Sequence, residues 1–353
     1  MRIAVALTSV LPPGLEESIA AGTGPRRDHL EFCRLAGAEK LELAAGRPRL
    51  LRRLPVRHPL IALWMAWTLY RRRRSVDVLV VDSEHVGLLL GLLLRFARSR
   101  PALVLVVHRV STPLKQLLIR LVGGGVTRYV FHYTHCDSVL AAAGVPPERR
   151  RHVPYLVDAS FWSPRAALQR HQICAVGLEF RDYGTLFEAV TGLDVEVEIA
   201  AGSPWSTKRD SSRDRSVPAN VRVGRRDYEG LRRLYASSLF TVVPLKENDM
   251  QAGITTMVES MAMGRPVIAS RTTGQVGTVR DGVNGLEVAP GDVLALRAAI
   301  ERLLTDPAER ERMGIAARGL VADEMTVEQF AQRMLAVVEE LANPAPALEA
   351  LRA

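Results

Sequence analysis

The segment Thr241–Val288 constrains the fold most, because it reads as a strand, a helix and a further strand with a turn residue at each junction. Its first apolar run ends at Pro244, and after a polar loop Gly253 precedes an apolar-periodic stretch that stops at Gly264. Helices commonly stop at a glycine, since glycine tolerates positive φ. The residues PVIAS that follow predict a short buried strand, and the Gly-rich stretch after them predicts a functional loop.

The junction at Gly253 favours the binding of a phosphate group. The first turn of a helix leaves backbone N–H groups unpaired and carries partial positive charge, so Ile254, Thr255 and Thr256 are expected to face a phosphate or diphosphate. Glu259 lies further along the same helix, where its carboxylate can accept hydrogen bonds from two neighbouring ribose hydroxyls. The alternative is a surface glutamate with no ligand.

The same segment resembles the donor-binding half of glycosyltransferase family 4, whose members are retaining enzymes with the GT-B fold. The family has two glutamates, the second of which opens a helix of the form EAMAxGxPVI, and then an NGxxV strand; here the helix is ESMAMGRPVI and the strand is NGLEV. Glu259 matches the second glutamate. Gln251 replaces the first, which in the family lies near the sugar, and an amide carries no charge. Glu247 is the nearest carboxylate that can substitute.

A second part of the resemblance begins at Ile173, where ICAVGLEFRDYGTLFEAV is similar to the opening strand and helix of the family's second domain. In the family a Lys or Arg after the VG pair binds the donor phosphates, and Arg181 has that position. Leu178 stands where the family often has another Arg, which implies one phosphate cation fewer. The segment EIAAGSP resembles the strand and glycine turn beneath the donor, so Gly202 joins the expected site.

The first half of the chain alternates apolar runs with helical patterns, as a parallel α/β sheet requires. The sequence predicts strands at residues 2–7, 76–81, 102–107 and 128–133, and helices at residues 84–99 and 113–122. Together with a second domain of the same kind, the resemblance implies two Rossmann-like domains facing across a cleft, which is the GT-B fold. It also implies that a helix at residues 328–341 returns to the first domain.

Loops after the predicted strands of the first half supply the candidates for the acceptor side, because function in open α/β sheets gathers at the carboxyl ends of strands. His108 follows the strand ALVLVV, and VVHRVST resembles the family's loop with a histidine that faces the sugar. We expect a neutral His108 that hydrogen-bonds the sugar or orients the acceptor. A satisfied structural histidine is the alternative. Asp28, His85 and Arg109 are the further acceptor-side candidates.

The length of 353 residues predicts two domains, since a domain usually holds about 100–200 residues. The stretch His152–Gln172 is irregular and rich in proline punctuation, and it resembles the family's crossover between domains. The first domain is therefore predicted at residues 1–165 and the second, which binds the donor, at residues 166–342. Residues 343–353 are expected to form a loose tail.

The net charge of +9 is concentrated in residues 1–165, which hold 25 Lys and Arg against 12 Asp and Glu. Such a field attracts an anionic acceptor or the acidic face of a membrane. The segment Arg57–Arg74 joins an apolar stretch to four arginines, and the stretch is shorter than the roughly 20 residues that a spanning helix needs. It either lies on a membrane or forms a half-buried domain helix with a solvated arginine end.

The resemblance implies a retaining, metal-independent glycosyltransferase of the hexosyltransferase kind. It takes a nucleotide sugar as co-substrate, needs no other cofactor, and transfers the sugar to an acceptor that is unknown and either anionic or associated with a membrane. The alternative is a noncatalytic protein of the same fold that binds sugar nucleotides or a membrane surface. A nucleic-acid-binding protein is disfavoured, because aromatic residues make up 5% of the chain and no RNP, KH or zinc-finger pattern occurs.

The cysteines and the first residues indicate the expected compartment. Cys33, Cys136 and Cys174 lack the spacing of metal ligands and leave one over if two were paired. The start MRIAVALTSV carries no secretory pattern. We therefore expect a reducing cytoplasm, with peripheral contact at the inner face of an anionic membrane as the further option.

Overall fold

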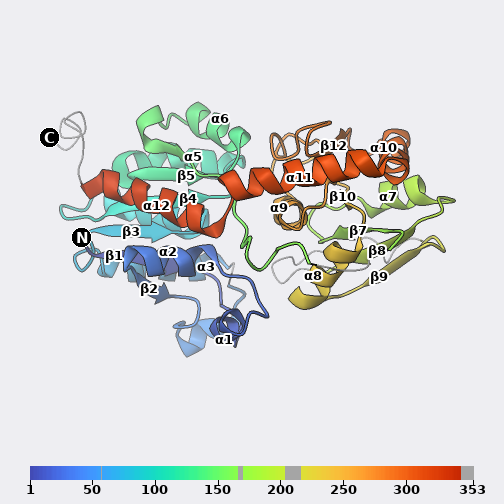
Figure 1. Ribbon diagram of the computed structural model, residues 1–353. Coiled ribbons are helices and arrows are strands. Elements are labelled where there is room, and N and C mark those ends of the chain that lie inside the picture. Colours follow the sequence, from blue (N-terminus) through green and yellow to red (C-terminus); the bar gives the residue numbers. More distant parts are fainter. Residues whose placement is uncertain (57, 166–169, 203–215, 343–353) are drawn as a thin grey trace. The chain divides into compact units, whose positions relative to one another are not determined.

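The protein folds into two compact units, each of which is an open parallel sheet with helices on both faces (Figure 1). The computed structural model describes residues 1–56, 58–165, 170–202 and 216–342. The first unit comprises Met1–Leu15, Arg27–Pro154 and the chain from Glu328 onward, and the second comprises Glu16–Arg26 and Tyr155–Val327. The tail predicted at residues 343–353 lies outside the described residues.

The first sheet has the strand order β2-β1-β3-β4-β5-β6, and all of its pairs are parallel. Its strands are β1 (Ile3–Leu7), β2 (Glu39–Glu42), β3 (Val78–Val81), β4 (Ala102–Val107), β5 (Arg128–Phe131) and β6 (Arg150–His152). The four inner strands are apolar and buried, as sheets covered on both faces require, and they confirm the predicted strands. The edge strands β2 and β6 have the sequences EKLE and RRH, which carry too little apolar character to be predicted.

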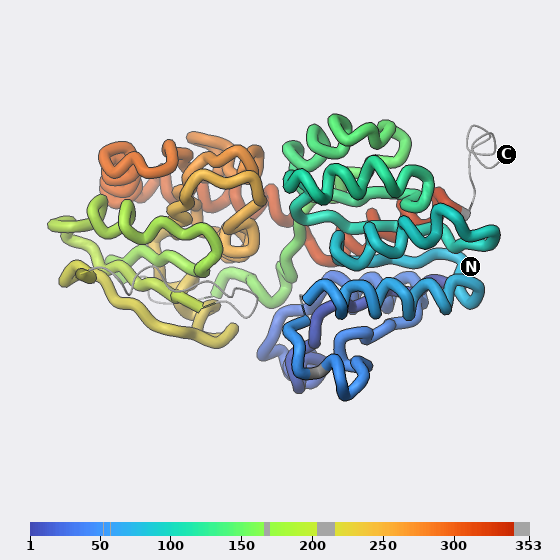
Figure 2. The backbone as a smooth tube through the Cα atoms, turned by 180° about the vertical axis from the view of Figure 1, so that it is seen from behind, coloured from blue at the N-terminus to red at the C-terminus, as the bar shows by residue number. Residues whose placement is uncertain are grey.

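Helices cover both faces of the first sheet. One face carries α2 (Asp28–Ala36) and α12 (Val327–Ala342) (Figure 1). The other carries α3 (Pro59–Arg71), α4 (Glu84–Arg95) and α5 (Pro113–Val122), which lie side by side (Figure 2), with α6 (Thr134–Ala142) beside α5. Within the described ranges, no helix combines the length and apolar character needed to cross a bilayer.

Helix α12 joins the first unit although it is the last helix of the described residues, as the resemblance implies. Its Phe330 ring lies 6.1 Å from the His132 ring, centroid to centroid. Farther along, the Arg151 guanidinium donates to a Glu340 carboxylate oxygen at 2.9 Å. A ring contact with His132, just after β5, and an ion pair with Arg151, within β6, therefore help to tie the helix to the first unit.

The second sheet has the order β12-β11-β10-β7-β8-β9, again with parallel pairs throughout. Its strands are β7 (Gln172–Val176), β8 (Glu196–Ala200), β9 (Val221–Gly224), β10 (Thr241–Val243), β11 (Val267–Ser270) and β12 (Gly285–Val288). One apolar core lies under α7 (Tyr183–Val190) and α10 (Val293–Thr305). The other lies under α8 (Tyr228–Ser237), α9 (Ile254–Ala262) and α11 (Pro307–Glu324). The strand–helix–strand reading of residues 241–288 is confirmed.

A buried carboxylate joins an early segment of the chain to the second unit. Asp158 accepts hydrogen bonds from the Arg26 backbone N–H at 2.9 Å and from the Arg26 guanidinium at 2.8 Å. Burial alone raises the pKa of Asp158, but the bonds from Arg26 and Ser160 outweigh it and hold the pKa at about 2. The short helix α1 (Leu15–Ala20) lies mostly in this early segment. No local sequence pattern predicted that the segment would belong to the second unit.

The close approach of α11 to the turn after α9 gives a test of the packing. A Cβ at Gly314 would lie 2.4 Å from the Gly264 carbonyl oxygen, so Gly314→Ala must separate two backbones. We expect it to lower the free energy of unfolding by about 1–3 kcal/mol in urea titrations.

Gly319→Ala, in the same helix, is the matched control. A Cβ at Gly319 meets no atom within 4 Å, so the better helix propensity of alanine should raise stability by about 0.5–1 kcal/mol. Equal effects of the two substitutions would contradict the packing of α11 described above.

Candidate active site

The first turn of α9 is built to face an anion. Gly253 precedes the helix with φ of 82°, and a Cβ there would lie 2.7 Å from a Val243 methyl carbon, so only glycine fits. Within the described part of the chain, the backbone N–H groups of Thr255 and Thr256 have no hydrogen-bond acceptor. These donors lie just beyond the carboxyl end of β10, and the helix dipole adds partial positive charge to them. The arrangement suits a phosphate.

Arg181 lies directly beneath this turn. Its Nε donates to the Val176 carbonyl at 2.8 Å, and its Nη2 donates to the Thr256 hydroxyl at 3.1 Å. Burial lowers the pKa of its guanidinium, yet an arginine stays charged in proteins. One end of the guanidinium lies 3.2 Å from the position that a Cβ would take at Gly253. The structure therefore places a buried guanidinium at the N-terminus of α9.

Hydrogen bonds join the loops after β7, β10 and β11 into one framework. The Phe180 carbonyl accepts from Lys246 N–H at 2.9 Å, and a Glu247 carboxylate oxygen accepts from Thr273 N–H at 2.9 Å. Phe180 has φ of 55°, a region that large side chains rarely adopt. Such strain persists only where the surroundings fix the backbone. Glu247, the proposed substitute carboxylate, thus holds two loops together.

Gln251 and Gly202 lie at the same edge of the second sheet. Gln251 precedes Gly253 in the loop after β10 and is half-buried, and its carbonyl accepts from Ile254 N–H at 3.4 Å. Gly202 follows β8, and its N–H donates to the Ala200 carbonyl at 3.0 Å. The parallel sheet brings both loops to one edge.

Glu259 is buried in the second turn of α9 and is oriented by a tyrosine. One of its carboxylate oxygens accepts from the Tyr235 hydroxyl at 3.0 Å. Tyr235 lies on α8, and burial together with the Glu259 charge raises its pKa well above the ordinary value, so it remains a donor. Sequence reasoning missed Tyr235, because a tyrosine on the apolar face of an amphipathic helix carries no local sign of a site.

The first unit gathers charged residues at the carboxyl edge of its own sheet. His108 follows β4, and its Nε2 lies 2.5 Å from a carboxylate oxygen of Asp82, which follows β3. The buried carboxylate of Glu84 accepts the backbone N–H groups of both His108 at 2.8 Å and Arg109 at 2.5 Å. Glu84 therefore fixes the turn that carries His108. Asp82 was not predicted, although its place directly after a buried strand was the available signal.

His108 is protonated at neutral pH. The surrounding protein atoms desolvate the imidazole and on their own would lower its pKa, but the carboxylates of Asp82, Glu84 and Asp28 raise it to about 9. The expectation of a neutral His108 is therefore wrong, because it ignored carboxylates that only the folded chain brings together. An imidazolium donates hydrogen bonds from both ring nitrogens.

The neighbouring His132 has the opposite behaviour. Its ring lies 5.6 Å from the His108 ring, centroid to centroid. Burial and the positive charge of His108 lower its pKa to about 4, so it is neutral. Its Nδ1 donates to the Val153 carbonyl at 2.8 Å. The pair thus consists of one charged and one neutral imidazole.

The remaining acceptor-side candidates differ in their surroundings. Asp28 opens α2, and its carboxylate lies 2.9 Å from His29 Nδ1. Burial alone would raise its pKa, but His29 and His108 hold it at about 2. His85 is exposed on α4, and Arg109 is half-buried beside His108. The structure therefore places Asp28 in the electrostatic environment of His108, with Arg109 adjacent in the chain.

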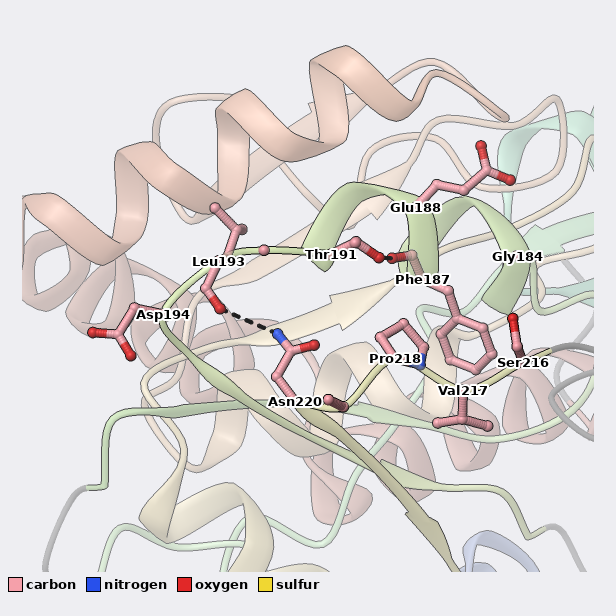
Figure 3. A pocket seen from close by; sticks show the side chains of 12 residues that line it. Gly184, Phe187, Glu188, Thr191, Leu193, Asp194, Ser216, Val217, Pro218 and Asn220 are labelled. Carbon is pink, nitrogen blue, oxygen red and sulfur yellow. Dashed lines mark hydrogen bonds between the residues drawn. The ribbon is translucent and has the colours of Figure 1, made fainter.

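A hollow of about 900 Å³ in the second unit lies away from these loops (Figure 3). It opens between α7 and the segments before β8 and β9, and Asn220 in its wall donates to the Leu193 carbonyl at 3.3 Å. These segments precede their strands, so the hollow belongs to the amino edge of the sheet. The donor-side residues lie at the carboxyl edge, which sets the two regions apart.

The Asp82–His108 pair predicts a pH dependence. Asp82→Asn should return the pKa of His108 from about 9 toward 6.5, which an NMR titration of the imidazole will measure. Since the folded-state pKa is the higher one, the pair stabilises the wild type below about pH 6.5, and this contribution is lost as pH rises through about 9. Asp77→Asn, before β3 at the opposite edge, is the control. An unchanged His108 titration in Asp82→Asn would contradict the assignment.

Comparisons with known proteins agree with this geometry. The family model described as "Glycosyl transferases group 1" matches residues 186–306. An MMP alpha-(1->4)-mannosyltransferase of Mycolicibacterium hassiacum is 27% identical over 58% of this chain and 51% of its own length. A GDP-mannose-dependent alpha-(1-6)-phosphatidylinositol monomannoside mannosyltransferase of Mycolicibacterium smegmatis is 27% identical over 60% and 62%. The chain thus spans about half to three-fifths of the length of these curated relatives.

Solved structures show the same fold. The sucrose-phosphate synthase of Thermosynechococcus elongatus superposes with a TM-score of 0.74 at 18% identity, covering 98% of this chain and 100% of that one. Anabaena HepE in complex with UDP-glucose superposes with a TM-score of 0.71 at 15% identity, covering 96% and 100%. The two parallel sheets and these superpositions show the GT-B fold, and the family model and the curated relatives support a glycosyltransferase assignment of the family 4 type.

Proposed function

We propose that the protein transfers a hexosyl group from a nucleotide sugar to an acceptor, with retention of configuration at the anomeric carbon. The observation that carries this proposal is the pairing of the Gly253 turn with the buried guanidinium of Arg181. A cation and free backbone donors at one helix N-terminus suit a diphosphate. Retention follows from the family resemblance. The relatives named for mannosyl transfer make a hexose the expected sugar.

In this proposal the second unit stabilises the leaving group. The bond between the anomeric carbon and the diphosphate oxygen breaks while the bond to the acceptor oxygen forms, and the acceptor loses its proton. Negative charge grows on the departing diphosphate, where Arg181 and the N–H groups of Thr255 and Thr256 are already aimed. No protein nucleophile is required for this role. Gln251, at the position that the family places near the sugar, binds a sugar hydroxyl through its amide.

Glu259 binds the ribose of the donor in the same proposal. Its carboxylate accepts two neighbouring hydroxyls, and the Tyr235 hydrogen bond holds it in one orientation. The contacts of Gly202 and Glu247 are to backbone groups, so these residues shape the loops around the nucleotide.

His108 acts as a cationic donor to the sugar in the first unit, because its pKa of about 9 keeps it protonated. Asp28, His85 and Arg109 bind the acceptor. The positive charge of this half of the chain favours an anionic acceptor, and one relative is named for a phosphatidylinositol monomannoside. The proposal includes no divalent metal, and transfer that persists in EDTA is the expected result.

A noncatalytic sugar-nucleotide-binding protein is the second candidate, and one observation favours it. Leu178, where the family often has an arginine, packs against the apolar core under α7 and α10. The site therefore has one phosphate cation fewer at that position. Thermal shifts with UDP- and GDP-sugars will identify a donor, since a ligand that binds the folded state raises its apparent stability. Stabilisation without transfer or donor hydrolysis by the purified protein would favour the second candidate.

Glu259→Ala is expected to weaken donor binding by about 1.5–3 kcal/mol, because charge-assisted hydrogen bonds to the ribose are lost. Isothermal calorimetry with the identified donor measures this change. Glu311→Ala removes an exposed carboxylate on α11 and should leave the affinity unchanged. Wild-type affinity in Glu259→Ala would remove Glu259 from the site.

Arg181→Lys is expected to lower kcat by about ten- to a hundredfold and to weaken inhibition by the nucleoside diphosphate product. A lysine keeps the charge but cannot reach the Val176 carbonyl and the Thr256 hydroxyl with one planar group. Steady-state kinetics with product inhibition measures both effects, and the melting temperature checks the fold. Normal kinetics in a folded variant would show that Arg181 acts elsewhere.

A further inference from the structure

The outer faces of α3 and α5 expose apolar side chains with the same spacing. Leu60, Leu63 and Trp67 lie on α3, and Leu114, Leu117 and Leu121 lie on α5; each is between 47% and 67% exposed. Positions i, i+3 and i+7 fall on one side of a helix. The opposite side of each helix also carries apolar residues, and these are buried, for example Ile61 and Ile119. Both helices are therefore apolar on the face that a domain helix normally keeps polar.

These two stripes belong to one surface. Helix α4 lies between α3 and α5 on the same face of the first sheet (Figure 2). On α4, Leu92 and Leu93 are half-buried and Leu92 packs against the apolar core, whereas Phe96 directly after the helix is among the most exposed apolar side chains. We call this face, with the six exposed residues of α3 and α5 and Phe96, the outer apolar surface. Exposed apolar side chains gathered on one face of a domain mark an interaction site.

A row of exposed arginines borders the outer apolar surface at one end. It consists of Arg71, Arg74, Arg95, Arg98, Arg100 and Arg120. These residues lie at or just beyond the carboxyl ends of α3, α4 and α5. Helices that connect parallel strands run antiparallel to those strands, so the three ends meet at the amino edge of the sheet. The arginine row is thus at the edge opposite to His108.

Aromatic residues mark the boundary between the apolar and the charged parts. Trp67 stacks on Tyr70 with ring centroids 5.5 Å apart, and the Arg73 guanidinium lies 4.2 Å from the Tyr70 centroid. Tryptophan and tyrosine have an apolar body and a polar end, and they prefer the interface between lipid and water. The order along α3 is therefore leucine, aromatic ring, arginine.

We propose that the outer apolar surface and the arginine row dock the first unit on an anionic lipid bilayer. The leucines, Trp67 and Phe96 enter the boundary between headgroups and acyl chains, and the arginines meet the lipid phosphates. A nucleic acid offers no apolar phase for the leucines, and pairing with a second copy through this face is an outcome of the test below. The inference deepens the proposed function and rests on it in one respect. For a glycosyltransferase, the docking surface locates the acceptor at a lipid surface.

Sedimentation with vesicles tests the apolar part. The wild type should bind vesicles of phosphatidylglycerol and phosphatidylcholine, and Leu63→Ser/Trp67→Ser should bind them about tenfold or more weakly. Leu294→Ser/Ile315→Ser is the matched control, since it removes side chains that are 79% and 68% exposed in the second unit. The control should bind as the wild type does.

The arginine row has a separate test. Arg71→Gln/Arg98→Gln/Arg120→Gln should weaken binding to anionic vesicles at low salt by about fivefold per arginine. It should also reduce the decline of binding with added salt. Vesicles of pure phosphatidylcholine should not distinguish this variant from the wild type.

Three results would overturn the inference: no binding of the wild type to anionic vesicles, binding of both variants at the wild-type level, or a wild-type dimer that Leu63→Ser/Trp67→Ser converts to a monomer. Donor-induced thermal stabilisation, measured on the same samples, should be equal in the wild type and in every variant. Vesicle binding without any donor binding would instead reject the proposed function and leave the docking surface in place.

Discussion

Parallel strand pairing is the constraint on which both candidate regions depend. In a parallel sheet all strands end at one edge, so residues far apart in the chain become neighbours without any long-range sequence signal. In the second unit this edge joins Arg181, after β7, to the turn at Gly253, after β10. In the first it joins Asp82, after β3, to His108, after β4. Each pair unites residues from different strand ends.

The carboxyl edges of the two sheets carry different arrangements of charge. At the donor side, the buried guanidinium of Arg181 and the backbone N–H groups at the start of α9 accumulate positive character. At the other edge three carboxylates surround one imidazole, and the result is a fixed positive charge on His108. Preorganised charge of this kind costs no rearrangement when a charged ligand arrives.

What the sequence predicted was local, and what it missed depends on contacts between distant residues. The central strands, the junction at Gly253 and the pattern around Glu259 follow from periodicity, turn residues and a motif. The edge strand β6 is short and basic, so periodicity gives no signal for it. The charge of His108 and the orientation of Glu259 by Tyr235 are set by side chains on other elements. The apolar stripe on α3 was visible, but its continuation on α5 required the order of the strands.

The place of α12 in the first unit affects how the protein forms during synthesis. The sheet of that unit is complete at β6, yet the helix that covers part of one face is made only after the whole second unit. Domains made first usually fold first. Here, however, the apolar positions that α12 later covers, such as the surroundings of His132, stay exposed in the nascent first unit until α12 has been made. A fragment that ends at Pro154 would keep that exposure permanently.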